Sequence, residues 1–238
     1  MDRSRLASAI LLGLVAGACA NPLGGLAGAE SDHAWGGVRA SWEVPRRVLS
    51  DGKPPAHQYL FEIESTVGSG EFTQALESGE SLTIDGTTFS GPSDVVAGFD
   101  VQQIAVDGRL RLRNEVGLGV DAIAGLGFTR LDLEAATAAT SADLDQQGFG
   151  PVLGTGLFFE LPPQLRFYAE LTWQPTFVGA GDVADVRIFD VGLDLRLTEA
   201  LGLILSWRDF AYREERGGAE SDLDLTARGP RLTLTLQF

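Results

Sequence analysis

Charged side chains recur at every second position in several segments of this chain. Arg109, Arg111 and Arg113 follow this spacing, and Asp190 and Asp194 obey the same period. Because successive side chains of a β-strand point to opposite faces, the spacing places the charges of each segment on one face. Such a face can form ion pairs and hydrogen bonds with other strands, or it can attract anions. The sequence therefore predicts a charge network of Arg109, Arg111, Arg113, Asp121, Arg166, Glu170, Asp190, Asp194, Arg196 and Arg208, joined by Arg231 and by Glu62 or Glu64.

Side chains suited to catalysis are scarce. The chain has two histidines, His33 and His57, and His57 beside Gln58 is typical of a solvated position at a strand end. Acidic side chains gather in 71–85, 143–145 and 214–224, where they could bind divalent cations. Such charge runs are usually solvated, and no EF-hand spacing is present. We therefore predict no enzymatic activity, no cofactor, and no catalytic, cofactor-binding or metal-binding residues.

The faces opposite these charges are apolar. From Val101 to Arg113 apolar residues occupy alternate places, and the alternation continues through Asp107-Gly108. We therefore expect one strand here, although Asp107-Gly108 is also a typical two-residue hairpin turn. Other alternating segments cover Val116–Phe128 and Phe189–Leu197.

The clearest hairpin runs from Phe149 to Phe177 around a turn at 161–164. Each of its strands carries a phenylalanine at both ends of the apolar stripe, Phe149 and Phe159 on one and Phe167 and Phe177 on the other. Ten residues of about 3.3 Å each, tilted by about 40°, rise roughly 25 Å along a barrel axis. That rise matches the apolar band of membrane barrels, so the phenylalanines are predicted to form aromatic girdles at two water interfaces.

Short and long gaps alternate between these segments. Short turns are expected at 114–115, 161–164 and 198–200. Long loops are expected at 68–93, 134–147 and 213–224, the first with a hairpin near Asp85-Gly86. Such asymmetry is expected of barrels with short periplasmic turns and longer outer loops.

About eight strands are expected from Tyr59 onward, beginning and ending on the same side. The Val38–Val44 segment would be a ninth strand, whereas a closed bacterial barrel takes an even number. We therefore expect eight strands, with Val38–Val44 as a periplasmic or rim strand. The alternative is ten strands, with a break at Asp107-Gly108.

The two ends of the chain indicate export and insertion. Residues 1–18 combine Arg3 and Arg5 with an apolar stretch that finishes in small residues, which is the layout of an export signal. Cleavage is expected after Ala18 or Ala20. Cys19, the only cysteine, follows a degenerate lipobox and is either lipidated or an ordinary residue near the cleavage site. The last strand resembles the assembly signal of outer-membrane barrels, through the alternating residues Leu232, Leu234, Leu236 and Phe238.

Composition narrows the class of protein further. The chain has 30 glycines, and Lys53 is its single lysine beside 17 arginines. No apolar run beyond the signal is long enough for a transmembrane helix, so any membrane span must be a β-strand. Loss of residues 1–18 leaves a net charge of −16, which argues against electrostatic binding of nucleic acid or an anionic surface.

The signal, about eight alternating strands, the pattern of short turns and long loops, and the terminal Leu-Thr-Leu-Gln-Phe resemble the small outer-membrane β-barrels of the OmpA membrane-domain and OmpX type. The resemblance is architectural and covers roughly residues 35–238, after the export signal at 1–18 and a flexible lead-in at 19–34. It implies an all-β, antiparallel transmembrane barrel in the bacterial outer membrane. It also implies outer-membrane lipid and the barrel assembly machinery as partners, no nucleic acid, and a surface role whose extracellular partner is left open.

The polar face is expected to line the lumen. An eight-stranded barrel is only wide enough for side chains to fill it, so these charges must pair with one another or with trapped water. We therefore predict a non-enzymatic barrel with a charge-filled lumen, acidic extracellular loops and a structural or surface-interaction role. Two alternatives stay open: a small passive or anion-preferring pore, which needs a wider lumen, and a lipocalin-like soluble periplasmic barrel, whose apolar stripes would face inward.

Overall fold

The computed structural model describes residues 34–44, 57–161, 164–178, 182–214 and 223–238. The export signal, Cys19 and nearly all of the lead-in lie outside these residues. The described chain forms β-strands joined by turns: β1 (Ala34–Glu43), β2 (His57–Leu76), β3 (Ser81–Ile84), β4 (Thr87–Ser90), β5 (Ser93–Arg113), β6 (Leu118–Ala136), β7 (Ser141–Leu161), β8 (Leu165–Val178), β9 (Asp182–Arg196), β10 (Leu201–Glu214) and β11 (Leu223–Gln237).

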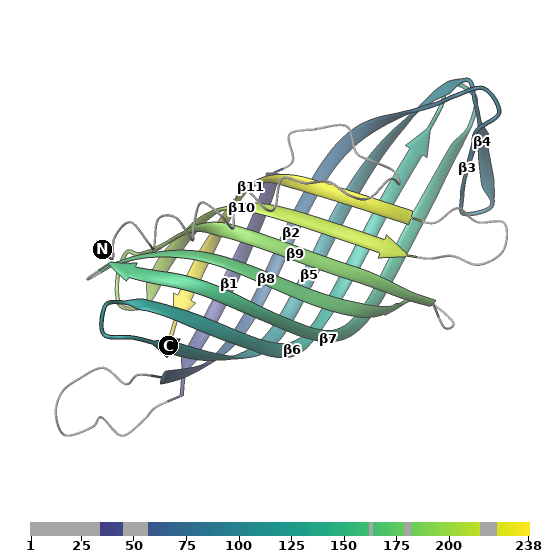
Figure 1. Cartoon of the computed structure of the whole chain (residues 1–238). Helices are drawn as coiled ribbons and strands as arrows, with labels where there is room; N and C mark the ends of the chain where they lie inside the picture. The colour runs from purple at the N-terminus through teal and green to yellow at the C-terminus, as the bar shows by residue number, and fades with distance from the viewer. Residues whose placement is uncertain (1–33, 45–56, 162–163, 179–181, 215–222) are drawn as a thin grey trace, which may run out of the picture.

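Nine of these strands close into a barrel in the order β1-β11-β10-β9-β8-β7-β6-β5-β2 (Figure 1). All neighbours are antiparallel except β1 and β11, which run parallel with Trp35 beside Arg231 and Ser41 beside Gln237. The all-β, mainly antiparallel fold is thus confirmed, whereas the expectation of eight or ten strands is wrong. One parallel pair allows an odd number to close, since only a ring of purely antiparallel neighbours must be even.

β5 passes through Asp107-Gly108 without a break. Asp107 pairs with Glu62 on one side and Gly125 on the other, and Gly108 pairs with Phe61 and Ala124. The ten-strand alternative therefore fails at the place where it needed a turn. Val38–Val44 is largely β1 and belongs to the closed wall, not to the rim.

The two ends of the barrel differ. The proximal end carries the 114–117 and 197–200 turns, and the distal end carries the small β3–β4 sheet (Figure 1). At the 114–117 turn, the Asn114 side chain accepts hydrogen bonds from the backbone N–H groups of Val116 and Leu118. The β3–β4 hairpin forms where it was predicted, with Asp85 and Gly86 at φ 46° and 73°, the left-handed region favoured in tight hairpins.

Two of the expected long loops are largely strand. β2 continues to Leu76, and β6 and β7 continue to Ala136 and back from Ser141, so only 137–140 remains a turn. Of the third expected loop, 215–222 lies outside the described residues. On β6 and β7 these distal ends resemble loops in sequence, because their outward positions are charged and their inward positions include Ala135 and Ala142, a pattern unlike a lipid-facing strand.

Inward and outward faces exchange their character along the barrel. On β5 the inward residues are Val95, Ala97, Phe99 and Val101 in the distal half and Gln103, Asp107, Arg109 and Arg111 in the proximal half, all buried. The side chains between them point outward and change in the opposite sense, from Asp94 and Asp100 to Ile104 and Val106. The barrel therefore has an apolar core in its distal half and a charged interior in its proximal half.

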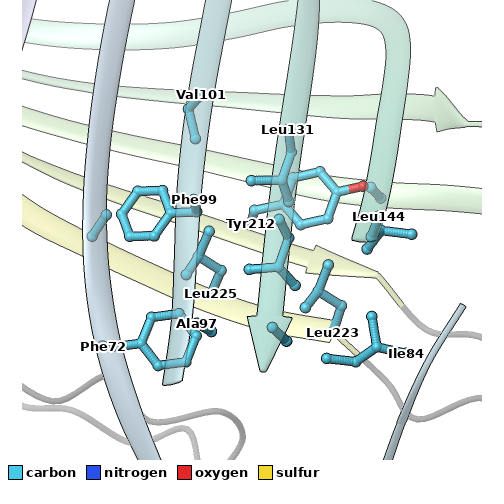
Figure 2. Close-up of a cluster of buried hydrophobic side chains, with 14 of the residues drawn as sticks. Phe72, Ile84, Ala97, Phe99, Val101, Leu131, Leu144, Tyr212, Leu223 and Leu225 are labelled. Atoms are coloured by element: carbon cyan, nitrogen blue, oxygen red, sulfur yellow. The ribbon is translucent and has the colours of Figure 1, made fainter. Parts of the chain in front are cut away.

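The distal core gathers side chains from most of the ring. Figure 2 shows Phe72, Phe99, Leu131, Leu144, Tyr212 and Leu225 meeting inside the wall. The β3–β4 hairpin adds Leu82, Ile84 and Phe89 to the same cluster. Leu131, Phe210 and Ala227 are 0% exposed, so this half is packed like the interior of a soluble protein.

Candidate functional site: a charge layer inside the barrel

Ten charged side chains form a layer across the proximal lumen, and we name it the charge layer. It is held by β1, β2, β5, β6, β8, β9, β10 and β11, because each of these strands directs alternate residues inward. Its members are Arg39, Glu62, Glu64, Arg109, Arg111, Asp121, Glu170, Asp190, Arg208 and Arg231.

Asp190 is the acceptor at one side of the charge layer. Arg208 Nη2 and Arg231 Nη1 lie 2.6 and 3.0 Å from Asp190 Oδ2, and Arg208 Nε also donates to the carboxylate at 3.1 Å. Asp190 is 3% exposed and both guanidinium side chains are equally enclosed. Charges this deeply buried must be paired, so Asp190 compensates two cations at once.

Glu64 links the strands at the closing seam, which is the parallel junction of β1 with β11. Its carboxylate pairs with Arg39 of β1, with Arg231 of β11 and, at 3.2 Å, with Arg208 of β10. Arg231 reaches across β1 because the intervening inward position is Gly37, whose missing side chain leaves the space between Thr66 and Thr233 open. The single parallel junction of the ring is therefore bridged by ion pairs on the inside.

Arg109 is the centre of the opposite side. Its Nη1 lies 3.0 Å from Asp121 and 2.5 Å from Glu170, and its Nη2 lies 3.0 Å from Glu62. Arg111 forms a bidentate pair with Asp121, with both N–O distances 3.0 Å, and its guanidinium lies 4.8 Å from the centre of the Phe158 ring. The planar fork of arginine suits donation to several carboxylates at once better than the lysine ammonium does.

Other predicted network members lie nearer the proximal mouth. Arg166 pairs with Asp194 at 2.6 Å, and Arg113 pairs with Glu160. Arg113 and Glu160 are more exposed than the charge layer, whereas Arg166 and Asp194 are as enclosed as Glu64. Arg196 lies at the end of β9, at the same mouth of the barrel, and is exposed.

Neutral amides and hydroxyls separate the charge layer from the distal core. Gln103 donates to Gln174 at 3.2 Å, and Gln174 donates in turn to Thr129 and Thr176. Polarity thus decreases in steps from ion pairs to amides to hydrocarbon. A gradual change avoids placing a charge directly against an apolar core, where its desolvation would be costly.

A small polar cavity lies beside the charge layer. It has a volume of about 40 Å³ and is lined by Asp107, Arg109, Glu170, Gln174 and Arg208 among others. Asp107 Oδ1 and Arg208 Nη1 are buried and have no hydrogen-bond partner among the described residues. The space suits water molecules bridging these groups, and it is far too small for a continuous aqueous channel.

The outer wall of the proximal half is apolar and exposed, and we name it the apolar belt. Leu126, Phe149 and Trp207 are 59%, 58% and 53% exposed. The apolar belt comprises Val38, Phe61, Ile63, Ile104, Val106, Leu112, Val120, Leu126, Phe149, Leu153, Leu171, Trp173, Phe177, Leu205, Trp207, Leu232 and Leu234. A soluble barrel needs such stripes inside, whereas here they form one encircling outer surface.

The predicted girdle residues pair as two rows on this wall. Phe149 lies beside Phe177, with ring centres 6.3 Å apart, and Phe159 lies beside Phe167 in the register of β7 and β8. The predicted assembly-signal residues also face outward, and Phe238 stacks on Trp42 of β1 at 5.3 Å. The terminal aromatic therefore sits on the closing seam.

The outer wall of the distal half is polar. Its side chains include Glu71, Asp94, Asp100, Asp132, Glu134, Asp143, Asp145, Asp185, Asp209 and Asp224, against Arg130, Arg187, Arg213 and Arg228. Several acids that were expected in loops, such as Glu71 and Asp143, thus lie on strands. Glu215, Glu220 and Asp222 lie outside the described residues, and among the rest no cluster of histidine, cysteine or acidic side chains has metal-site geometry.

Sequence reasoning found most of the charge layer but missed three of its features. Arg39 was overlooked because β1 was assigned to the rim. Glu62 and Glu64 both face inward, whereas only one was expected to do so. Asp107 lines the cavity, although no sequence pattern distinguishes it from its neighbours on β5.

No protein-family model matches the chain, and no curated protein or solved structure is significantly similar to it. Within the described residues there is no helix of the length and apolarity needed to cross a bilayer.

Proposed function

We propose that this chain is a non-enzymatic outer-membrane β-barrel whose charge layer seals the lumen and whose distal half projects from the bilayer as an acidic surface. The observation that carries the proposal is the apolar belt. Large hydrocarbon side chains that encircle a barrel with a charged interior are stable in lipid and unfavourable in water.

The height of the apolar belt supports this placement. The Phe149–Phe177 and Phe159–Phe167 rows are ten residues apart on each strand. Such a separation corresponds to roughly 25 Å along the axis of a tilted barrel, close to the apolar height of outer-membrane barrels. The short proximal turns would face the periplasm, and the distal half would stand outside the cell.

The interior supports a sealed barrel over a pore. The charge layer is closed by mutual pairing, and the cavity beside it admits only water-sized groups. The distal core adds a second, apolar barrier. The role left to such a molecule is structural or lies in surface interaction, with the acidic distal wall offered to the medium.

Cell fractionation tests the proposal. We expect the full chain in the outer-membrane fraction, resistant to carbonate extraction, with a faster gel mobility before boiling than after it, because a closed barrel has no free edge from which to unravel. Recovery in the soluble periplasmic fraction, with the same mobility before and after heating, would contradict it.

A further inference from the structure

Asp107 is an acidic side chain of the proximal lumen that makes no ion pair within the described part of the chain. It is 8% exposed and lines the cavity, and its Oδ1 atom has no hydrogen-bond partner there. Burying an ionised carboxylate without a compensating cation is costly, by far more than an unmade hydrogen bond. Something other than an ion pair must therefore stabilise Asp107 inside the barrel.

The charges of the charge layer cancel without Asp107. Its ten members are five arginines and five carboxylates. The two pairs nearer the mouth, Arg166–Asp194 and Arg113–Glu160, are balanced as well. An ionised Asp107 would therefore leave one uncompensated negative charge in an enclosed interior. Water in the cavity can complete the hydrogen bonds of Asp107, but it cannot neutralise this charge.

The cross-strand neighbours of Asp107 on the inner face are a carboxyl group and a glycine. Asp107 lies directly opposite Glu62 in the register of β2 and β5. On the β6 side it lies opposite Gly125, where an added Cβ would come within 2.6 Å of the Asp107 Cβ. Directly opposite side chains on one face of an antiparallel pair have Cβ atoms about 4.5–5.5 Å apart. Asp107 and Glu62 are thus adjacent acids, and both are buried.

The arginines nearest in sequence and register are engaged by other carboxylates. Arg109, two residues along β5, pairs with three of them, and Arg39 of β1 pairs with Glu64. Glu62 Oε2 accepts no hydrogen bond among the described residues, although Arg109 Nη2 lies 3.0 Å from it. Each of the two adjacent acids therefore has an oxygen atom available for one more hydrogen bond.

The other charged groups that face the cavity come from strands all around the ring. They are Arg39 of β1, Glu64 of β2, Arg109 of β5, Glu170 of β8, Asp190 of β9 and Arg208 of β10. β6 and β7 present the apolar Ile123 and Val152 to the same space. With Asp107 included, four carboxyl groups face three arginines, so the cavity wall has a surplus of one acid.

We propose that Asp107 and Glu62 bind one proton between them, as a carboxylic acid beside a carboxylate. One proton removes the surplus charge and supplies a donor for an oxygen atom that otherwise has no partner. Adjacent carboxyl groups in a shared site hold a single proton in this way, because two like charges side by side are unfavourable. The proton site lies within the charge layer, so it makes the stability of the sealed interior depend on pH. The inference rests on the charge layer and is independent of where the barrel resides.

Infrared spectroscopy of the unaltered full chain, folded in detergent, tests for the bound proton. The sample is kept in mildly acidic buffer, above the usual titration range of an exposed aspartate at about pH 4. We expect the C=O stretching band of a protonated carboxylic acid, which ionised carboxylates lack. The band should disappear in Asp107→Asn and remain in Asp145→Asn, the matched control on the exposed distal wall. Absence of the band from the folded unaltered protein would overturn the proposal, whether or not the variants fold.

The pH dependence of unfolding gives a second measurement. Both acids ionise above about pH 4 in the unfolded chain, whereas the folded barrel keeps one proton, so the folded state binds more protons. This contribution to stability is therefore largest in mild acid and is lost as the pH rises toward the point where the pair releases its proton. Over that range the unfolding equilibrium constant of the unaltered protein should rise about tenfold per pH unit relative to that of Asp107→Asn. Asp145→Asn should follow the unaltered protein, and identical pH profiles for the unaltered protein and Asp107→Asn would refute the assignment.

Discussion

The proximal and distal halves of the barrel share most of their strands, but their polar and apolar side chains occupy opposite faces. The proximal half is charged inside and apolar outside, and the distal half is apolar inside and polar outside. β5 and β6 cross the boundary with no slip in alternation, so the backbone does not change there. Only the residue types at inward and outward positions change, near Gln103 on β5 and Thr129 on β6. Alternation alone therefore specifies the strands, whereas composition on each face indicates the medium that each half is suited to.

Removing a carboxylate should produce the largest difference between the two halves in the free energy of unfolding. Asp190→Ala would remove one of the two carboxylates that Arg208 and Arg231 share in an enclosed interior and would leave Glu64 to pair with three arginines, so we expect a loss of about 3–5 kcal/mol in the free energy of unfolding. Asp145→Ala, which breaks the exposed Arg130–Asp145 pair of the distal wall, is the matched control and should leave the free energy of unfolding nearly unchanged. Urea unfolding in detergent measures both.

The same experiment distinguishes the sealed barrel from the pore. Solvent in a wide channel would screen the freed arginines, so Asp190→Ala would then change ion selectivity and leave the unfolding midpoint in place. We expect the opposite, together with no steady conductance of the unaltered protein in planar bilayers. Steady channels and an unshifted midpoint would favour the pore.

Truncating a leucine to alanine should destabilise the protein more in the distal half than in the proximal half, the opposite of the order expected for a carboxylate. Leu225→Ala empties part of the distal core, where Leu225 is 1% exposed, and should lower the free energy of unfolding by about 2–5 kcal/mol. Leu126→Ala on the apolar belt makes the same chemical change without leaving a cavity, so we expect less than half of that effect in detergent. Similar losses for the two variants would show that the distal half lacks a true packed core.

Adding a methyl group tests the junction of the halves and should have the smallest effect. A Cβ at Gly68 would lie 2.3 Å from the Trp35 ring, so Gly68→Ala should cost about 1–3 kcal/mol as Trp35 shifts. At Gly98 the nearest atom would be 4.0 Å away, and Gly98→Ala should be neutral or slightly stabilising. Thermal unfolding with tryptophan fluorescence would report both the stability and the movement of Trp35.

The sequence predicts the proximal half well because its signals are local. Alternation between Arg109 and Leu112, and the matched phenylalanines of β7 and β8, follow directly from the two-residue period of a strand. Which carboxylate meets which arginine depends on the register of neighbouring strands. The role of Glu64 as partner of Arg39, Arg208 and Arg231 therefore emerged only from the three-dimensional arrangement.

The distal half and the strand count were harder to predict for two physical reasons. Inward alanines such as Ala135 and Ala142 carry a weak apolar signal, and their charged outward neighbours look like loop residues. Closure is not encoded by either strand alone, since the parallel pairing of β1 with β11 depends on the tilt of the whole ring. A rule of even strand number consequently misassigned β1.

The parallel junction of β1 and β11 also fixes the sidedness of the two ends of the barrel. Both strands run toward the proximal end, where Ser41 lies beside Gln237, so both finish at the same mouth of the barrel. In the orientation proposed above, the closing pair of aromatic rings, Trp42 and Phe238, lies toward the periplasm.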